Sequence, residues 1–439
     1  MKTRLTSPRR PPARPARSTL AQCIAVIGLA SAAASAAAQT TVLPEIQVTA
    51  AGIPDYEFDS ARNGVYCPTC NFGDGNNRFA FSDPSNKLWV GHIDFNTGAF
   101  YPPDGHGALV DSGVAAATTY GNGPEWMCST AGSQLVYTKY QNGVVGDATA
   151  GIALASMVAG AWTPGFFPGA DSIPKSSPAA TLDCNDTAPR INYVNPAKTG
   201  IWWRSLSSPA QQNVVNISNL TDGNSRRWVS GTRKIIFQGH PVDSPGLLID
   251  QVFLYDTDTG VTEQLTPSDN NGKTSAFMWK APEFNNEYVF FTMAALRKQI
   301  LVYRKLKGAD GVFRWTVIKT ITAPPALPFF FSPEPFVHNG RSYIFGNVSA
   351  SSRFFDRSIP TQIAMSGIDP LVSNFRLLTN NSQTPRVRLD PEFFITAKGP
   401  FIYYNRLVPA TAQFPDGIND GVWRVDTKLG PPLKTTTLR

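Results

Sequence analysis

The sequence predicts an all-β fold, and three observations support this prediction. Hardly any segment has the 3.6-residue periodicity of an amphipathic helix, short β-branched and aromatic runs recur, and Gly, Pro, Asn or Asp turns separate them. Of the 439 residues, 42% are hydrophobic and only 16% are charged. This composition disfavours a disordered chain and a coiled coil. Predicted strands include 87–90, 134–137, 234–237, 287–291, 342–345 and 401–404.

These strands recur with a period of about 53 residues. A Pro-Glu pair precedes an aromatic strand at Pro124-Glu125, Pro282-Glu283, Pro333-Glu334 and Pro391-Glu392. Weaker starts at Asn77-Arg78, Pro189-Arg190 and Arg227-Trp228 complete a set of seven. A period of about 40–55 residues in an all-β chain is typical of β-propeller blades. We therefore expect residues 61–439 to form one β-propeller with seven four-stranded antiparallel blades around a central channel. Six blades, or a pair of β-sandwiches, are the alternatives.

The first 38 residues predict a cleaved signal peptide. Six basic residues precede an apolar stretch from Ile24 to Ala38, and Ala36-Ala37-Ala38 offers a cleavage site. Residues 39–60 are expected to be an extended lead-in. Removing the signal lowers the net charge from +7 to +1, because those six residues carry no acidic counterpart. We expect a periplasmic or secreted protein without a remaining membrane span, and the charge gives no reason to expect a nucleic-acid partner.

Cysteine usage agrees with export. Cys23 leaves with the signal, and four cysteines remain. An even number in an exported protein favours disulfides. Cys67–Cys70 as a local bridge and Cys128–Cys184 as a long-range one are the favoured pairs, although four cysteines allow three pairings. A four-cysteine zinc site and a redox motif at Cys67–Cys70 are the alternatives.

Residues 252–266 contain a strand, an Asp-x-x-Thr-Gly turn and a second strand ending in Leu-Thr. This segment resembles the blade signature of TolB-like, PD40-type propellers, and Trp279-Lys280-Ala281-Pro282 resembles the opening of the next blade. Residues 92–98 and 423–428 repeat the turn weakly. The family spans periplasmic scaffolds, peptidase domains and polysaccharide lyases, so the resemblance implies a fold and no single activity. Residues 332–343 are similar to a blade opening of five-bladed furanosidase-type glycoside hydrolases. That similarity implies an Asp base and a Glu acid on inner strands.

The innermost strand of each propeller blade faces the channel, so the repeated starts predict a site at the channel mouth. The predicted catalytic carboxylates are Glu125, Glu283, Glu334 and Glu392. The predicted substrate-binding residues are Arg190, Arg227, Arg388, Asp390, His240, His338 and Trp202. Ca²⁺ bound by the carboxylates is an alternative, and no other cofactor is expected. Each Glu would instead have a scaffolding role if it braced the neighbouring blade.

These residues predict an exported enzyme that acts on a polysaccharide or glycoside, as a hydrolase or a lyase. The alternative is a non-catalytic periplasmic or cell-surface propeller that binds carbohydrate or protein. The expected partner is a carbohydrate polymer or oligosaccharide, and a protein partner stays open. The sequence has no G-x-S-x-G elbow, H-E-x-x-H, Walker A or post-strand G-x-G-x-x-G motif. Serine esterases, zincins, NTPases and dinucleotide oxidoreductases are therefore disfavoured.

Overall fold

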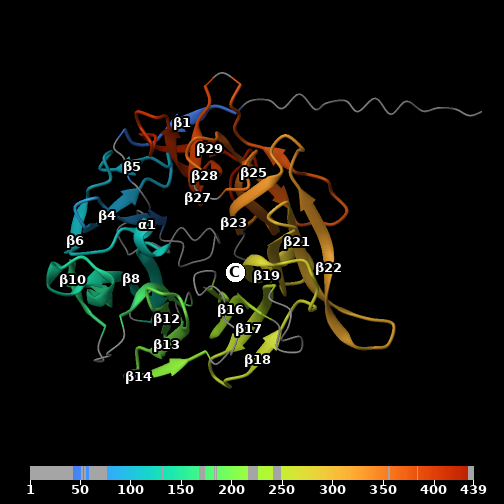
Figure 1. The fold of residues 1–439 in the computed structure, drawn as a ribbon, viewed down its shortest axis with the longest axis horizontal. Coiled ribbons are helices and arrows are strands. Elements are labelled where there is room, and N and C mark those ends of the chain that lie inside the picture. Colours follow the sequence, from blue (N-terminus) through green and yellow to red (C-terminus); the bar gives the residue numbers. More distant parts are fainter. Residues whose placement is uncertain are drawn as a thin grey trace, which may run out of the picture. The chain divides into compact units, whose positions relative to one another are not determined.

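Seven antiparallel sheets follow one another around a central axis, as the sequence predicted (Figure 1). This computed structural model describes residues 43–50, 53, 56–58, 77–130, 132–167, 174–181, 183, 185–215, 226–240, 249–353, 356–382 and 384–433. The ring lies within the compact unit Thr40–Arg439. We number the blades 1 to 7 in the chain order of their innermost strands.

The first four blades run from the blue through the cyan and green to the first yellow part of the chain. Blade 1 contains β2 (Glu57–Phe58), β3 (Asn77–Ser82) and β4 (Lys87–Ile93), with β5 (Phe100–Tyr101) and β6 (Ala108–Ser112) both pairing with β4. Blade 2 contains β7 (Glu125–Ser129), β8 (Gly132–Tyr140), β9 (Ala150–Val158) and β10 (Ala161–Phe166). Blade 3 contains β11 (Ser176–Ala180), β12 (Arg190–Val194), β13 (Ile201–Ser205) and β14 (Ser208–Val214). Blade 4 contains β15 (Arg227–Trp228), β16 (Lys234–Gly239), β17 (Gln251–Asp256) and β18 (Thr262–Gln264).

The remaining blades complete the ring. Blade 5 contains β19 (Thr274–Ala281), β20 (Glu287–Ala294), β21 (Gln299–Lys307) and β22 (Phe313–Thr322). Blade 6 contains β23 (Phe329–His338), β24 (Arg341–Ser349), β25 (Thr361–Gly367) and β26 (Arg376–Leu377). Blade 7 contains β27 (Val387–Thr396), β28 (Gly399–Val408), β29 (Ile418–Asp426) and β1 (Glu45–Gln47). The helical elements described are short: α1 (Ala117–Tyr120), η1 (Gln141–Gly143), η2 (Asp147–Thr149) and η4 (Pro282–Phe284).

The two ends of the chain meet in blade 7. The outermost strand of this blade is β1, which pairs antiparallel with β29 through Glu45 opposite Val425 and Gln47 opposite Trp423. The chain then supplies β2 as the innermost strand of blade 1. Residues 39–60, expected only to be an extended lead-in, therefore include two strands of the ring. Both strands are too short to show the alternation that identifies longer ones.

The hydrophobic core lies between the blades rather than within one layer. Among the described residues, seven large clusters of buried apolar side chains each join two neighbouring blades, including the pair formed by blades 7 and 1. In that pair, Phe58 and Phe79 of blade 1 pack with Phe394 and Tyr403 of blade 7. A single sheet cannot bury both of its faces alone, and this ring of interfaces solves the problem without a long exposed sheet edge.

The turns that join outer strands explain the Asp-x-x-Thr-Gly motif of blade 4. After β17, the Oδ1 atom of Asp256 accepts hydrogen bonds from the backbone N–H of Asp258 (2.9 Å) and Thr259 (3.3 Å). Gly260 then takes a φ of 72°, which favours glycine, and leads into β18. Asp94 and Gly98 (φ 69°) form the same turn in blade 1.

Candidate active site in the central channel

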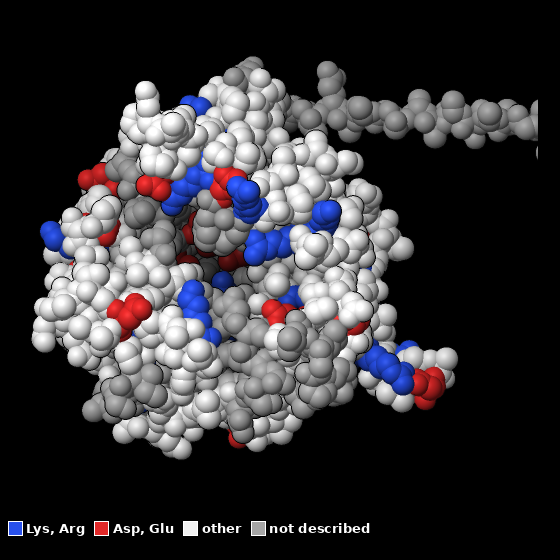
Figure 2. All heavy atoms as spheres, in the orientation of Figure 1, with Lys and Arg blue, Asp and Glu red and all other residues white. Residues whose placement is uncertain are grey.

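The innermost strands carry charged side chains to the axis of the ring. In blades 1, 2, 4 and 7 a charged residue is followed directly by an aromatic one, at Glu57-Phe58, Glu125-Trp126, Arg227-Trp228 and Glu392-Phe393. Successive side chains on a strand point to opposite faces. The aromatic ring packs into a core cluster between blades, so the charged group before it points away from that cluster. Figure 2 shows the result as a hollow in the ring with acidic atoms in its depth and basic atoms around its edge.

Five carboxyl groups interact electrostatically in this channel, although their strands are far apart in the sequence. They are Glu57 on β2, Glu125 on β7, Glu334 on β23, and Asp390 and Glu392 on β27. They come from blades 6, 7, 1 and 2, which are consecutive around the ring. Within the described residues, none of the five carboxylates takes part in a side-chain hydrogen bond or an ion pair, unlike Glu45 and Glu283. They are therefore available to a molecule in the channel.

Burial and mutual repulsion raise the pKa values of these glutamates. The pKa of Glu334 rises to about 8, because burial disfavours its charge and because Asp390 and Glu125 lie nearby, although Arg227 partly opposes this effect. Burial and the neighbouring carboxylates also raise the pKa values of Glu57 and Glu392 well above their ordinary range. These side chains keep some contact with channel water: Glu392, the most buried, is 9% exposed.

Glu125 differs from the other glutamates in having Arg226 as well as Arg227 as a cationic neighbour. The pKa of Glu125 is raised overall, because burial and Asp390 outweigh the opposing effect of Arg227 and Arg226. The two arginines belong to β15 and the residue before it, in blade 4. The glutamates of the channel therefore differ in how strongly positive charge opposes the rise of their pKa values, and Glu125 has two arginines beside it. Such a separation of environments is how enzymes assign acid and base roles to carboxyl groups.

A backbone irregularity recurs where the inner strands reach the site. The inner strands of blades 3, 5, 6 and 7 each have a β-bulge with one non-glycine residue in the left-handed region; these residues are Ser177 (φ 50°), Ser275 (φ 53°), Ser332 (φ 43°) and Asp390 (φ 50°). In blade 7 the strained residue is itself one of the five carboxylates. Bulges re-aim side chains, and strained backbone of this kind gathers at functional sites.

The bulges identify equivalent positions in blades 5, 6 and 7, and they show that Glu283 is not equivalent to Glu334 and Glu392. Glu334 and Glu392 each follow the bulge residue by two positions, and the equivalent residue of blade 5 is Phe277. Glu283 instead lies in η4, after β19 has ended, where its carboxylate accepts hydrogen bonds from Ser342 N (2.8 Å) and Oγ (2.9 Å). The structure therefore does not place Glu283 with the other predicted carboxylates; it braces blade 5 against blade 6. The Pro-Glu-Phe sequence of residues 282–284 therefore matches that of residues 391–393 but occupies a different position in its blade.

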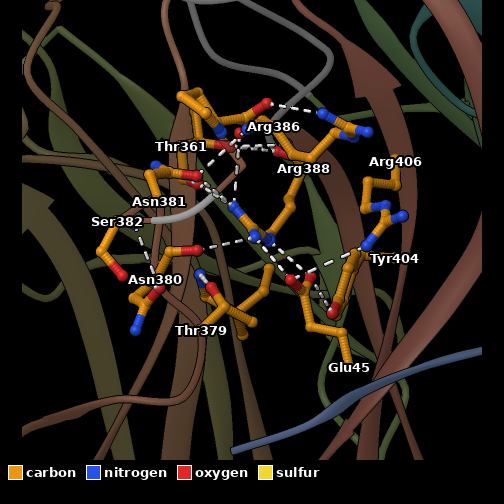
Figure 3. A network of polar contacts seen from close by, with 12 residues as sticks. Glu45, Thr361, Thr379, Asn380, Asn381, Ser382, Arg386, Arg388, Tyr404 and Arg406 are labelled. Atoms are coloured by element: carbon orange, nitrogen blue, oxygen red, sulfur yellow. Dashed lines mark hydrogen bonds and ion pairs between the residues drawn. The ribbon is translucent and has the colours of Figure 1, made fainter. Parts of the chain in front are cut away.

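Arg388 also lies away from the channel mouth, in a network that fastens β1 to the ring (Figure 3). Its guanidinium is fully buried and binds Glu45 through Nε–Oε1 (2.8 Å) and Nη2–Oε2 (2.7 Å). Its Nη1 donates to the carbonyl oxygen of Thr361 (2.6 Å), and Tyr404 donates to Glu45 Oε1 (2.6 Å). Burial opposes the charge of Glu45, but Arg388 and Tyr404 lower its pKa overall. Predicted as a substrate-binding residue, Arg388 is used within the fold, because the bulge between Leu389 and Glu392 reverses the alternation of faces along β27 and puts Arg388 and Glu392 on opposite faces.

Arg190 is another predicted binding residue that joins two blades. It is the first residue of β12, the second strand of blade 3. It therefore lies beside the end of the inner strand β11, after the chain has reversed direction. Its guanidinium contacts Thr257 Oγ1 and Asp258 Oδ1 of blade 4 and lies 4.7 Å from the centre of the Trp203 ring. The weak repeat start at Pro189-Arg190 therefore marked a second strand, not an inner one.

The two histidines and the tryptophan of the predicted set are separate from the carboxylates. His240 follows β16, and its Nε2 lies 3.7 Å from Asp250 Oδ1. His338 ends β23, where its Nε2 lies 2.9 Å from the carbonyl oxygen of Gly430, and it is 4% exposed. Trp202, on the third strand of blade 3, packs against the core shared by blades 2 and 3. Thus Glu125, Glu334, Glu392, Arg227 and Asp390 are brought together, and these three residues are not.

Several predictions concern residues that the structure does not describe. Cys67, Cys70 and Cys184 lie outside the described residues, and nothing can be said of the Cys128 side chain, so both disulfides stay predictions. Within the described part, no group of three or more His, Cys, Asp or Glu side chains is arranged to hold a metal ion. The described residues also include no helix that is long and apolar enough to cross a membrane.

Sequence reasoning missed two residues of the site, Glu57 and Arg226. Glu57 lies in the region expected to be a lead-in, without the Pro-Glu pair used to find the repeat. The signal that identifies it is the charged–aromatic dipeptide, which it shares with Glu125-Trp126 and Glu392-Phe393. Arg226 is fully buried beside Arg227, and no sequence pattern distinguishes it.

Known proteins resemble this chain only distantly. The sequence matches no protein-family model and no curated protein. Periplasmic gluconolactonase of Pseudomonas aeruginosa is similar at 12% identity over 80% of this chain and 99% of that chain, with a TM-score of 0.43. The β-propeller domain of the Trilobed protease from Pyrococcus furiosus is similar at 7% identity over 80% and 92%, with a TM-score of 0.43. The α-L-arabinanase of Penicillium chrysogenum is similar at 10% identity over 75% and 99%, with a TM-score of 0.42. Likenesses this distant do not bear on activity or substrate.

Proposed function

We propose that this chain is an enzyme that hydrolyses glycosidic bonds in its central channel. Glu334 acts as the general acid and Glu125 as the general base. The observation that carries the proposal is the gathering of five carboxyl groups from four consecutive blades, with Arg226 and Arg227 beside them. Paired carboxyl groups in different protonation states are the usual means of cleaving a glycosidic bond.

Each residue has a role that follows from its surroundings. With a pKa of about 8, Glu334 carries a proton at neutral pH and can donate it to the oxygen of the leaving sugar. Arg226 and Arg227 oppose the rise in the pKa of Glu125, and the ionised form of Glu125 can take a proton from the attacking water while the water oxygen bonds to the anomeric carbon. The glycosidic C–O bond breaks, and the proton gained by Glu125 returns to Glu334 through solvent.

The proposed setting is outside the cytoplasm, on a polysaccharide or oligosaccharide. The predicted signal peptide over residues 1–38 supports export, and the small net charge expected after its removal agrees with a substrate that is not a nucleic acid. Glu57, Asp390 and Glu392 complete the carboxyl group cluster. Repulsion from Asp390 and Glu125 helps to keep the proton on Glu334.

The test uses two classes of substrate with each variant. A nitrophenyl glycoside has a leaving group that departs without protonation, whereas an alkyl glycoside or a disaccharide needs an acid. Glu334→Gln is expected to lose about 10²- to 10⁴-fold in kcat on alkyl glycosides and much less on nitrophenyl glycosides. Glu125→Gln is expected to lose activity on both classes, because the attacking water is no longer activated.

Glu283→Gln is the matched control, because Glu283 carries the same Pro-Glu motif and lies outside the channel. It should retain wild-type kcat on both substrate classes. The proposal fails if a panel of glycosides gives no turnover with the wild type, including the case in which sugars bind without being cleaved. It also fails if the folded Glu125→Gln and Glu334→Gln proteins stay fully active, or if the products are unsaturated sugars, which indicate elimination.

A further inference from the structure

The channel glutamates of blades 6 and 7 are presented by the same backbone arrangement. In both inner strands a bulge residue in the left-handed region precedes a proline and then the glutamate, as Ser332-Pro333-Glu334 in β23 and Asp390-Pro391-Glu392 in β27. Proline fixes φ and lacks an N–H donor, so it restricts the backbone that carries each carboxyl group. Both carboxyl groups are therefore held in place, as a preorganised binding group requires.

Glu392 lies within a row of inner strands that each supply a glutamate. Its strand β27 contacts β23 on one side and β2 on the other, and β2 contacts β7. These three neighbours carry Glu334, Glu57 and Glu125. The carboxyl group of Glu392 interacts electrostatically with all three, so it faces the channel that the four strands share.

Glu392 has neither a hydrogen-bond donor nor an arginine among its main neighbours. Its side chain is 9% exposed, and within the described residues its carboxyl group takes part in no side-chain hydrogen bond or ion pair. Arg227 opposes the raised pKa of each of the other three glutamates, whereas burial and four carboxyl groups, including that of Asp390, have the main effects on the pKa of Glu392. Tyr403, opposite Glu392 on β28, is neutral and donates its hydroxyl to the carbonyl oxygen of Gly98. A buried polar group without a partner is costly, and a ligand with N–H donors and a positive charge would satisfy this one.

We infer that Glu392 binds the ammonium group of an amino sugar, such as a glucosamine unit, while Glu334 and Glu125 act on the glycosidic bond. An ammonium group has three N–H donors, and charge-assisted hydrogen bonds to a carboxylate are the strong ones. The inference rests on the proposed function for its choice of a sugar. It adds that the substrate is cationic, which agrees with the excess of carboxyl groups over arginines among the described residues of the channel.

Binding exchanges a proton for the positive charge of the ligand. In the free channel Glu392 carries a proton at neutral pH, because burial and the neighbouring carboxylates raise its pKa well above the ordinary range. When the ammonium group arrives, the carboxyl O–H bond breaks, the proton leaves to solvent, and the carboxylate pairs with the ligand. The net charge beside Glu334 is unchanged by this exchange, so Glu334 keeps the proton that it donates. Release of one proton makes the affinity rise by up to about tenfold per pH unit.

The experiment measures binding without turnover. D-Glucosamine, N-acetyl-D-glucosamine and D-glucose are titrated into the wild-type full chain at pH 5.5 and 6.5 and followed by NMR. At pH 6.5 glucosamine should bind about tenfold or more tightly than either neutral sugar, and added salt should weaken its binding. The affinity for glucosamine should rise by up to about tenfold between the two pH values, while the affinities for the neutral sugars change much less.

Glu392→Gln keeps the shape of the side chain but cannot ionise. It should remove both the preference for glucosamine and the dependence on pH, whereas Glu392→Asp should keep part of the preference because the carboxyl group remains. Glu287→Gln is the control, since Glu287 is an exposed glutamate of β20 that pairs with Arg304; it should leave glucosamine binding unchanged. Circular dichroism verifies that each variant is folded.

Three results would overturn the inference: glucosamine shows no advantage over the neutral sugars, its advantage does not grow from pH 5.5 to 6.5, or the advantage persists in folded Glu392→Gln. Hydrolysis of neutral glycosides without a preference for glucosamine refutes the cation subsite alone. Glucosamine binding that depends on Glu392, without cleavage of any glycoside, refutes the proposed function alone.

Discussion

Replacing Glu334 by Gln is expected to stabilise the protein at alkaline pH and not at acidic pH. The pKa of this carboxyl rises from 4.5 to about 8 on folding, so it is neutral in both states below pH 4.5. Above pH 4.5 this carboxyl ionises in the unfolded chain, which lowers the free energy of that state, whereas it stays protonated in the folded site. The free energy of unfolding therefore falls until the pH passes 8. At ~1.4 kcal/mol per pKa unit, the upper limit is about 5 kcal/mol. Because channel water screens the charge, we expect about 2–3 kcal/mol.

The assay is urea unfolding followed by tryptophan fluorescence at pH 4.5, 6, 7.5 and 9. The difference between Glu334→Gln and wild type should be near zero at pH 4.5 and grow with pH, and Glu57 and Glu392 should then ionise more readily because one negative neighbour is gone. Glu263→Gln, at an exposed position on β18, is the control and should change stability by less than about 0.5 kcal/mol at every pH. A stability difference that is independent of pH, or that is largest at pH 4.5, would refute the reasoning.

Three further predictions concern the contacts between blades. Arg388→Ala should destabilise the protein by about 3–5 kcal/mol at pH 7 in urea unfolding, because Glu45 would lose its buried partner; the lowered pKa of Glu45 means that this difference shrinks as the pH falls below 4.5. Glu283→Gln and Ser342→Ala should show a coupling of about 1–3 kcal/mol in a double-mutant cycle, and purely additive effects would contradict the brace between blades 5 and 6. Lys319→Met should lower the thermal midpoint by several degrees, since Lys319 Nζ lies within hydrogen-bonding distance of three carbonyl oxygens, at the end of β25 and in the segment that follows it; an unchanged midpoint would show that these contacts contribute nothing.

The ring was predictable from the sequence because each blade repeats the same physical problem. A four-stranded sheet with two apolar faces needs neighbours, so aromatic strands recur at a nearly constant spacing. It was harder to predict which residue of each repeat faces the axis. Pro282-Glu283 has the same letters as Pro333-Glu334, but bulges and hairpins, which are not visible in residue types, decide which Glu faces the axis.

The candidate site was predictable only where its residues also belonged to the repeat. Glu125, Glu334 and Glu392 shared a motif, and Asp390 stood beside one of them. Glu57 escaped because its strand has two residues and follows a segment that pairs with the other end of the chain. Such contacts between remote segments depend on tertiary structure, so local propensity does not reveal them.

Fastening of β1 by Arg388 also affects when the channel can be completed. The segment that begins with Glu45 leads directly to Glu57, and its anchoring partners Arg388 and Tyr404 lie more than 340 positions later. While the ribosome is still extending the chain, the first strands have no place to dock, and Glu57 has no blade 7 to pack beside. A nascent or C-terminally shortened polypeptide would therefore lack the complete set of acidic groups until its final sheet emerged.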